Sequence, residues 1–331
     1  MVIVTYHSAE DVGPCIDSVL AQSVGVEVLA VDNASTDGTV GVLGAYVERF
    51  PSVRVFASPR NVGLAAGNNV ALGRVTGDYL LFLNPDTVLG GGTLAHMAGF
   101  LDSNPDFGVV GPLNRYADGT RHSTFSRDWG LARIFVWRVL PYSVPRRLCD
   151  RYSRYEFREP AFVSGACLLI RRSLFERIGG YDPEFFLAIE DVADLCLRAR
   201  RAGFRVGFLP EVEVTHIGAR SGRRVTFTVL WEGNRASVYY CLKHHGIPRA
   251  LACTALLIGN AVARSAAAAA ISVVRPGYRG KILRHLRLAG LLVARNPILR
   301  GRSALRGALA PAPRGSGPGA AKKRGLPGAD E

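Results

Sequence analysis

The sequence predicts an α/β protein with a mostly parallel sheet flanked by helices, followed by a helical and basic C-terminal extension. In the first half of the chain, short β-branched runs alternate with helical patterns, as in repeated βα units. After residue 216 the strand pattern ends and long helical stretches follow. Charge is also uneven, because residues 1–218 carry 21 basic and 24 acidic side chains whereas residues 219–331 carry 20 and 3.

Alternating patterns define the elements of the body. Strands are expected at 2–6, 26–32, 53–57, 79–84 and 108–112, with helices at 9–22, 38–49, 65–74 and 91–103. Residues 115–160 lose this periodicity, which predicts an irregular excursion over the active-site side. A buried strand at 162–172, a helix at 191–202 and strands at 205–208 and 212–216 complete the body. Helices are expected at 224–244, 249–273 and 279–294, and the Gly-, Pro- and Lys/Arg-rich tail from about 307 is predicted to be disordered.

Composition excludes several classes of protein. With 331 residues, 48% hydrophobic and 21% charged, the chain is globular and large enough to bury a sizeable core. Its six cysteines form no C-x-x-C pair, which argues against a disulfide framework and a structural zinc site and favours a reducing cytoplasm. The first residues, MVIVTYHSAED, lack the basic and long apolar regions of a signal peptide, so none is expected.

Polar residues follow the strands at several points. Asp32 and Asn33 come after the second strand, Asp86 after the fourth, and Asp191 and His216 later in the body. A single aspartate in such a place is usually a turn or helix-cap residue. In open α/β sheets, however, ligands bind beyond the carboxyl ends of the strands, so the set as a whole predicts a binding site.

Five blocks of the sequence resemble glycosyltransferase family 2, in the order and spacing of that family. They are VIVTYHS (2–8), VLAVDNASTDGT (28–39), SPRNVGLAAGNN (58–69), YLLFLNPDT (79–87) and GGYDPEFFLAIEDVADLCLR (179–198). The resemblance covers roughly residues 1–245 and is strongest to bacterial rhamnosyltransferase-like enzymes of cell-surface polysaccharide assembly. It implies a Rossmann-like GT-A fold, a nucleotide-sugar donor, a divalent cation and an inverting transfer. We expect a catalytic domain at 1–222, a membrane-associating helical region at 223–306 and a disordered basic tail at 307–331.

On the donor side, the resemblance implies that Asp32 contacts the pyrimidine, since a carboxylate can accept the N–H of a base. Thr5 and Tyr6 are expected to line the same pocket, together with Asn33. The loop at 58–69 resembles the family's donor-side wall, and its expected donor-binding residues are Arg60, Gly63 and Asn68. The chain lacks the Walker A and Rossmann glycine fingerprints, which disfavours an ATPase or a dehydrogenase.

A divalent cation, Mg²⁺ or Mn²⁺, is implied near the donor diphosphate, where it would offset the charge of the leaving group. The family's acidic D-x-D motif is here Asn84-Pro85-Asp86, so Asp86 is the expected metal carboxylate and Asn84 a neutral oxygen donor toward ribose or a metal-bound water. His216 resembles a further metal or diphosphate ligand. The arginines just after it, Arg220, Arg223 and Arg224, form either a basic loop that closes over the diphosphate or a solvated basic patch.

A general base must take the proton of the acceptor hydroxyl, and the resemblance assigns this role to Asp191. The family usually reads E-D-x-D-L, but here one additional residue separates Asp191 from Asp194. If the insertion is absorbed after Asp191, the base keeps its place. If the alignment pivots on Asp194 instead, Asp191 is displaced.

Residues 250–274 are long enough to cross a bilayer, but Asn260 and Arg264 interrupt the apolar run and alanine dominates it. We expect a helix that lies on the membrane interface, with arginines and lysines near anionic headgroups. A spanning helix and an ordinary packed helix are the alternatives.

These observations predict an inverting, metal-dependent glycosyltransferase that moves a sugar, such as rhamnose from a dTDP donor, onto a lipid-linked or polysaccharide acceptor. The enzyme is expected in the cytoplasm, peripherally bound to the inner face of the cell membrane. One alternative is a non-catalytic sugar-nucleotide-binding relative, because of Asn84 and the insertion after Asp191. The other is a nucleic-acid-binding protein, disfavoured because the basic C-terminal third contains alanine and leucine rather than stacking aromatics.

Overall fold

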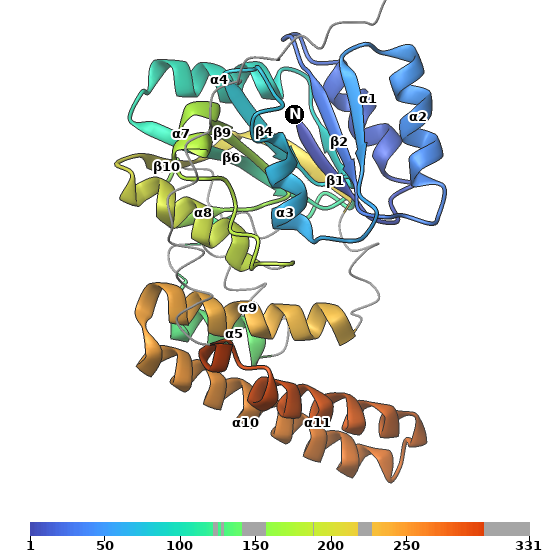
Figure 1. The fold of residues 1–331 in the computed structure, drawn as a ribbon, viewed down its shortest axis with the longest axis vertical. Helices are drawn as coiled ribbons and strands as arrows, with labels where there is room; N and C mark the ends of the chain where they lie inside the picture. Colours follow the sequence, from blue (N-terminus) through green and yellow to red (C-terminus); the bar gives the residue numbers. More distant parts are fainter. Residues whose placement is uncertain (122–124, 127–128, 141–156, 188, 218–226, 301–331) are drawn as a thin grey trace, which may run out of the picture.

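The computed structural model describes residues 1–121, 125–126, 129–140, 157–187, 189–217 and 227–300. A twisted sheet with helices on both faces forms the body, and a separate layer of long helices lies against one side of it (Figure 1). The predicted α/β class with a helical C-terminal extension is confirmed. The tail at 307–331 lies outside the described residues.

The main sheet has eight strands in the order β3-β2-β1-β4-β9-β6-β10-β5. Strand β1 pairs in parallel with β2 and β4, β2 with β3, and β6 with β10, whereas β9 is antiparallel to both of its neighbours. The parallel pairs bring the carboxyl ends of β1, β2 and β4 to one edge. Their bounds are β1 Val2–Thr5, β2 Val28–Asp32, β3 Val53–Ala57, β4 Tyr79–Leu83, β5 Thr87–Leu89, β6 Phe107–Arg115, β9 Cys167–Arg171 and β10 Arg205–His216.

Alternation along β1 divides the core into two layers. Val2 and Val4 belong to one hydrophobic cluster and Ile3 to the other, and all three are buried. Each such side chain contributes about 1.5–3 kcal/mol when fully buried. The Ile3 layer packs α1 Val12–Leu20, α2 Thr39–Arg49 and α4 Thr93–Ser103 against the sheet, and the other layer packs α3 Leu64–Asn68, α7 Arg172–Arg177 and α8 Ile189–Arg201.

The C-terminal layer consists of α9 Phe227–His245, α10 Ile247–Ser272 and α11 Arg279–Ala294. The bounds of these three helices are close to those expected from the sequence. The cluster that contains Val2 continues through α8 into them and includes Leu257 of α10 and Leu288 of α11. The helical layer therefore shares a hydrophobic core with the body. Short elements that complete the described fold are η1 Asn69–Ala71, β7 Phe125–Ser126, α5 Leu131–Arg138, β8 Phe162–Val163, η2 Pro276–Tyr278 and η3 Pro297–Arg300.

Three local predictions were wrong. The expected strand at 162–172 is broken into β8 and β9, because Ser164–Ala166 turn away and Gly165 sits against Val192 of α8. The expected strands at 205–208 and 212–216 form a single strand, β10, with a register shift between Leu209 and Glu213. Residues 129–138 lie in the stretch expected to be irregular, yet they include helix α5.

Candidate active site at the carboxyl ends of the strands

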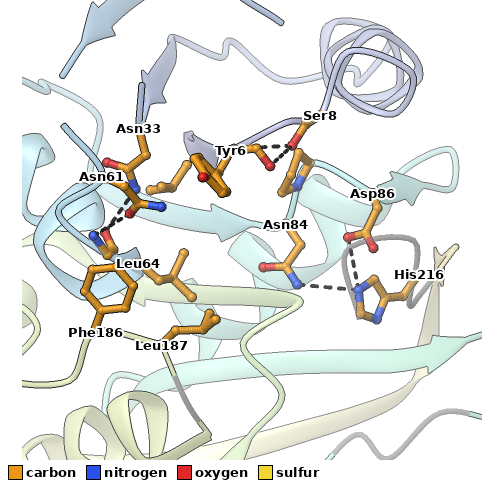
Figure 2. A pocket seen from close by; sticks show the side chains of 13 residues that line it. Tyr6, Ser8, Asn33, Asn61, Leu64, Asn84, Asp86, Phe186, Leu187 and His216 are labelled. Carbon is orange, nitrogen blue, oxygen red and sulfur yellow. Dashed lines mark hydrogen bonds and ion pairs between the residues drawn. The ribbon is translucent and has the colours of Figure 1, made fainter. Parts of the chain in front are cut away.

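A pocket of about 330 Å³ opens beyond the ends of β1, β2 and β4 (Figure 2). Its lining residues come from the first part of the body, up to Asp86, and from the later part that includes Phe186, Leu187 and His216. Its walls are formed by Val4, Tyr6, Ser8, Asn33, Asn61, Gly63, Leu64, Asn84, Pro85, Asp86, Phe186, Leu187 and His216. The site therefore lies where the sequence predicted, at the carboxyl ends of parallel strands.

Asp32 lies behind this pocket rather than in its lining. Its side chain is buried, and its two oxygens accept hydrogen bonds from Thr5 Oγ1 at 2.9 Å and from the backbone N–H of Ser35 at 2.9 Å. Thr5 is likewise fully buried, whereas Tyr6 is 48% exposed and lines the pocket. In this conformation Asp32 fixes the turn after β2, and of Thr5, Tyr6 and Asp32 only Tyr6 lines the pocket.

The loop at 58–69 forms one wall through backbone contacts. Asn33 Nδ2 donates to the carbonyl of Gly63 at 3.2 Å, and Asn61 Oδ1 accepts the N–H of Gly63 at 2.9 Å. Arg60 is exposed and does not line the pocket, and Asn68 borders a smaller cavity behind it. The loop thus contributes Asn61, Gly63 and Leu64 to the pocket itself.

The adjoining wall is formed by the segment with Phe186 and Leu187, which the sequence did not predict as pocket residues. The backbone N–H of Leu64 donates to the carbonyl of Phe186 at 2.7 Å. Gly63 has a φ of +87°, and a Cβ at this position would lie 2.5 Å from the same oxygen. Ser8 was missed as well. The only sequence signal for Phe186 and Leu187 is their place just before the Glu190-Asp191 pair.

Asn84, Asp86 and His216 form a polar group on the pocket wall (Figure 2). His216 Nε2 lies 3.1 Å from Asp86 Oδ1 and 3.4 Å from Asn84 Nδ2. The antiparallel pairing of β5 and β10, in which Thr87 faces His216, brings these residues together. The structure therefore brings together Asp86 and His216, the predicted metal ligands, and Asn84, the predicted oxygen donor toward ribose or a metal-bound water.

The donor set of this group fits an oxygen-preferring divalent cation that is completed by a ligand. A carboxylate, an imidazole and an amide oxygen suit Mn²⁺ and are acceptable to Mg²⁺. Among the described residues no group of three or more His, Cys, Asp or Glu side chains could hold a metal. Two strong protein ligands leave coordination positions for phosphate oxygens, so these residues suit a cation that arrives with its nucleotide.

Asp191 lies at the first turn of α8, next to a cavity of about 10 Å³ that adjoins the pocket. The cavity and the pocket share Leu64 and Asn84 in their walls. Asp191 Oδ1 accepts the N–H of Val192 at 2.6 Å, and Oδ2 has no hydrogen-bond partner among the described residues. Burial, with the neighbouring charges of Glu190 and Asp194, raises the pKa of Asp191 to about 8.

Glu190 and Asp194, the acidic neighbours of Asp191, are paired with basic side chains away from the pocket. Glu190 accepts two hydrogen bonds from Arg138 Nη2, both at 3.0 Å. Asp194 accepts from Arg198 Nε at 2.7 Å, and its partners His244 and Lys243 also hold its pKa well below the usual range despite burial. Neither residue lines the pocket or the small cavity. Of the three carboxylates, Asp191 alone borders the site.

The basic loop predicted after His216 lies outside the described residues. Arg220, Arg223 and Arg224 fall within 218–226, which the structure does not describe.

Gly165 lines the small cavity, where a Cβ would lie 2.8 Å from Val192 Cγ2. A small residue is therefore required beside Asp191.

Comparison with known proteins gives the fold and the family. Mannosyltransferase PcManGT of Pyrobaculum calidifontis, solved with GDP-Man and Mn²⁺, superposes with a TM-score of 0.52 at 20% identity, over 88% of this chain and 85% of that protein. GalNAc-T7, solved with UDP, GalNAc and Mn²⁺, gives 0.57 at 17% identity, over 73% of this chain and 47% of that protein. These likenesses, with the sheet order and the pocket, define a GT-A fold.

Sequence similarity extends the comparison. The model of glycosyl transferase family 2 matches residues 1–179. The N-acetylglucosaminyl-diphospho-decaprenol L-rhamnosyltransferase of Mycobacterium tuberculosis is 32% identical over 262 residues, 74% of this chain and 84% of that protein. Rhamnosyltransferase WbbL of Escherichia coli K12 is 26% identical over 168 residues, 49% of this chain and 63% of WbbL.

The fold and the site are those of a glycosyltransferase. The chain belongs to glycosyl transferase family 2, and its relatives include rhamnosyltransferases. The predicted family, GT-A fold and enzyme class are confirmed. The individual roles of the site residues stay predictions.

Proposed function

We propose that this glycosyltransferase transfers a sugar from a nucleoside diphosphate sugar, with inversion, to a lipid-linked acceptor. One observation carries the proposal: Asn84, Asp86 and His216 line a pocket that adjoins the cavity beside Asp191, and Asn84 lines both. The first three offer ligands to a cation and a diphosphate, and Asp191 offers a carboxylate oxygen with no partner among the described residues. Rhamnose is the proposed sugar because two relatives are rhamnosyltransferases.

In the proposed reaction the donor diphosphate lies against Asp86 and His216, and its base and ribose lie toward Tyr6 and Asn61. The acceptor hydroxyl gives its proton to Asp191 Oδ2, directly or through the single water that a cavity of about 10 Å³ can hold. Its oxygen forms a bond to the anomeric carbon, and the bond from that carbon to the diphosphate breaks. A bound Mg²⁺ or Mn²⁺ supplies positive charge that offsets the charge of the departing diphosphate.

Release of nucleoside diphosphate tests this proposal. Purified protein is incubated with dTDP-, UDP- and GDP-sugars, with a polyprenyl-diphosphate-linked acceptor, and with Mn²⁺, Mg²⁺ or EDTA. We expect release from dTDP-rhamnose, dependent on the acceptor and abolished by EDTA. Release from a different donor would reject rhamnose but keep the reaction, whereas no release and no calorimetric binding of any donor would reject both.

We further propose that α10 and α11 bind the surface of an anionic membrane without spanning it. Helix α10 is long and apolar enough to cross a bilayer, the one such helix in the part of the chain that the structure describes. Its mid-helix polar residues, however, contact protein: Asn260 Nδ2 donates to the carbonyl of Arg138 at 3.2 Å, and Arg264 Nη2 to that of Val139 at 3.0 Å. Crossing the membrane would break these contacts.

The opposite side of α10 is apolar and exposed. Leu251 is 55% and Val262 50% exposed, and Leu286 on the adjoining helix α11 is 49% exposed. Exposed arginines Arg275 and Arg279 follow at the turn between the two helices. An apolar strip with neighbouring cations matches the boundary between acyl chains and anionic headgroups.

Vesicle sedimentation tests the membrane proposal. The protein is expected to pellet with vesicles containing phosphatidylglycerol and to stay in solution with pure phosphatidylcholine. Replacing both Val262 and Leu286 by glutamate is expected to abolish pelleting, whereas Val47→Glu, an exposed valine on α2, leaves it unchanged. Equal pelleting of the double variant, or resistance of the wild type to carbonate extraction, would reject a surface helix.

A further inference from the structure

Helix α9 of the C-terminal layer holds the protein segment that contains Asp191. This segment, residues 182–194 without the undescribed residue 188, runs from the loop before α8 through its first two turns. It includes the pocket wall of Phe186 and Leu187. In Figure 1, α8 lies on the side of the body that faces α9. Any group on α9 that fixes this segment therefore acts on both the pocket wall and Asp191.

Lys243 makes the central contact between α9 and this segment. Its side chain is only 5% exposed, and its Nζ lies 2.6 Å from Asp182 Oδ2 and 2.6 Å from Asp194 Oδ1. His244 Nε2 also lies 2.7 Å from Asp194 Oδ1, and Tyr239 OH donates to Asp182 Oδ2 at 2.9 Å. One lysine thus ties the start of the segment to its end.

A second contact fixes Glu190, the residue just before Asp191. Ser237 on α9 donates its hydroxyl to Glu190 Oε1, and Arg138 at the end of α5 donates to both oxygens. Arg138 reaches this position because α9 carries Gly233 there, where a Cβ would lie 2.7 Å from the guanidinium. Glu190 is therefore neutralised and held by groups from outside the sheet.

Asp191 lies between these two held carboxylates. Buried charges are tolerated when they are paired, and the partners of Glu190 and Asp194 meet that requirement. Asp191 has no such partner in the part of the chain that the structure describes, so its orientation depends on the neighbours that flank it in α8. Basic side chains pair with Glu190 and Asp194, which explains how three buried acids fit into two turns of α8. Asp191 thereby keeps one carboxylate oxygen for the proposed reaction.

We propose that α9 is a structural part of the active site, with Lys243 and Ser237 as positioning residues that orient α8 and thereby Asp191. This inference rests on the proposed function, because it gives Asp191 the role of the base. It assigns the C-terminal layer a task in turnover in addition to membrane binding. A purely structural contact between α8 and α9 would contribute to stability without a selective effect on the chemical step.

The test compares kcat, donor affinity and hydrogen exchange in the full-length protein. Ser237→Ala removes one hydrogen bond to Glu190, and Lys243→Met removes the cation with a side chain of similar length. We expect kcat to fall about tenfold in Ser237→Ala and about 100-fold in Lys243→Met, with the donor Kd changed by less than about threefold. Amide exchange should accelerate in peptides covering 182–194 and stay unchanged in β1 and β2.

Matched controls are Ser272→Ala, near the end of α10, and Arg177→Met, an exposed cation on α7. Both are expected to behave as wild type. If Ser237→Ala and Lys243→Met keep wild-type kcat, or lose kcat and donor affinity by equal factors, α9 does not position the base. If Lys243→Met does not fold, Ser237→Ala alone decides between these outcomes.

The proposed function fails in a different way. An inactive wild type, or an Asp191→Asn variant with full activity, would reject the role of Asp191 before any variant of α9 is considered. With an active wild type and an inactive Asp191→Asn, the results for Ser237 and Lys243 concern the positioning role alone.

Discussion

Asp86 and His216 meet at the pocket because β10 runs antiparallel to β5, which places His216 Nε2 3.1 Å from Asp86 Oδ1. Asp86 follows β4, and His216 ends β10. Their proximity turns two isolated polar residues into a possible pair of metal ligands. Both have Asn84 beside them on the same wall.

Substitution at this pair should weaken metal dependence in a graded way. We expect Asp86→Asn to lower kcat at least about 100-fold and His216→Gln about tenfold, because a charged oxygen ligand contributes more than a neutral nitrogen to holding a hard cation. Titration of activity with Mn²⁺ should show a higher half-saturating concentration in His216→Gln. Glu48→Gln on the surface of α2 is the control, and unchanged Mn²⁺ titrations in both site variants would exclude this pair as ligands.

The pH dependence of turnover should follow the carboxyl of Asp191. A general base works when deprotonated, and burial raises the pKa of Asp191 to about 8, so kcat is expected to rise with pH and level off above about pH 8. Measurement at saturating donor and acceptor from pH 6 to 9.5 checks this. Asp191→Asn should lower kcat about 10²–10⁴-fold and lose the rise. A wild-type profile that is flat over this range would contradict the assignment.

The carboxyl of Asp191 should also lower the free energy of unfolding once it is charged. Its pKa is 3.8 in the reference state and about 8 in the fold, so between these pH values the folded protein binds the additional proton. The free energy of unfolding due to this group therefore falls as pH rises toward 8. Asp191→Asn is expected to stabilise the protein by about 1–3 kcal/mol at pH 8.5 and by less at pH 5.

Asp194→Asn is the matched comparison, measured by urea unfolding at the same two pH values. Its pKa is depressed by His244, Arg198 and Lys243, so removing the charge leaves buried cations without their partner. We expect it to destabilise the protein at both pH values, by about 3–5 kcal/mol. Equal effects of the two substitutions would mean that α8 does not distinguish these carboxylates.

Gly63 should tolerate no side chain. Its φ of +87° disfavours L residues, and a Cβ would lie 2.5 Å from the carbonyl oxygen of Phe186. Gly63→Ala is expected to cost about 1–3 kcal/mol of stability and to weaken donor binding, because it forces the two pocket walls apart. Gly44→Ala, in the open middle of α2, should instead stabilise by up to about 1 kcal/mol. Calorimetric donor titration and thermal unfolding of both variants check this, and a Gly63→Ala variant with wild-type affinity would show that the walls adjust.

The sequence by itself determined the class of fold, the edge of the sheet that carries the site and most of its polar residues. These follow from local rules, since strand and helix periods are short and parallel strands bring their carboxyl ends to one edge. Asp86 and His216 were predicted from their places after strands and Asn84 from the family resemblance, and all three line one wall. Phe186, Leu187 and Ser8 also line the pocket but were not predicted, because apolar or small residues in a loop carry no signal of their own.

Only the tertiary structure decided which acidic residue of α8 borders the pocket and which ones form ion pairs. From the sequence, Asp191 was the predicted base, and the additional residue between it and Asp194 left its place in α8 open. In the fold, Asp194 meets Lys243 and His244 of α9, and Asp191 meets a cavity beside the pocket. Partners this distant along the chain are set by how α9 packs on α8. A carboxylate's charge, burial and hydrogen bonds depend on that packing and on no local pattern of residues.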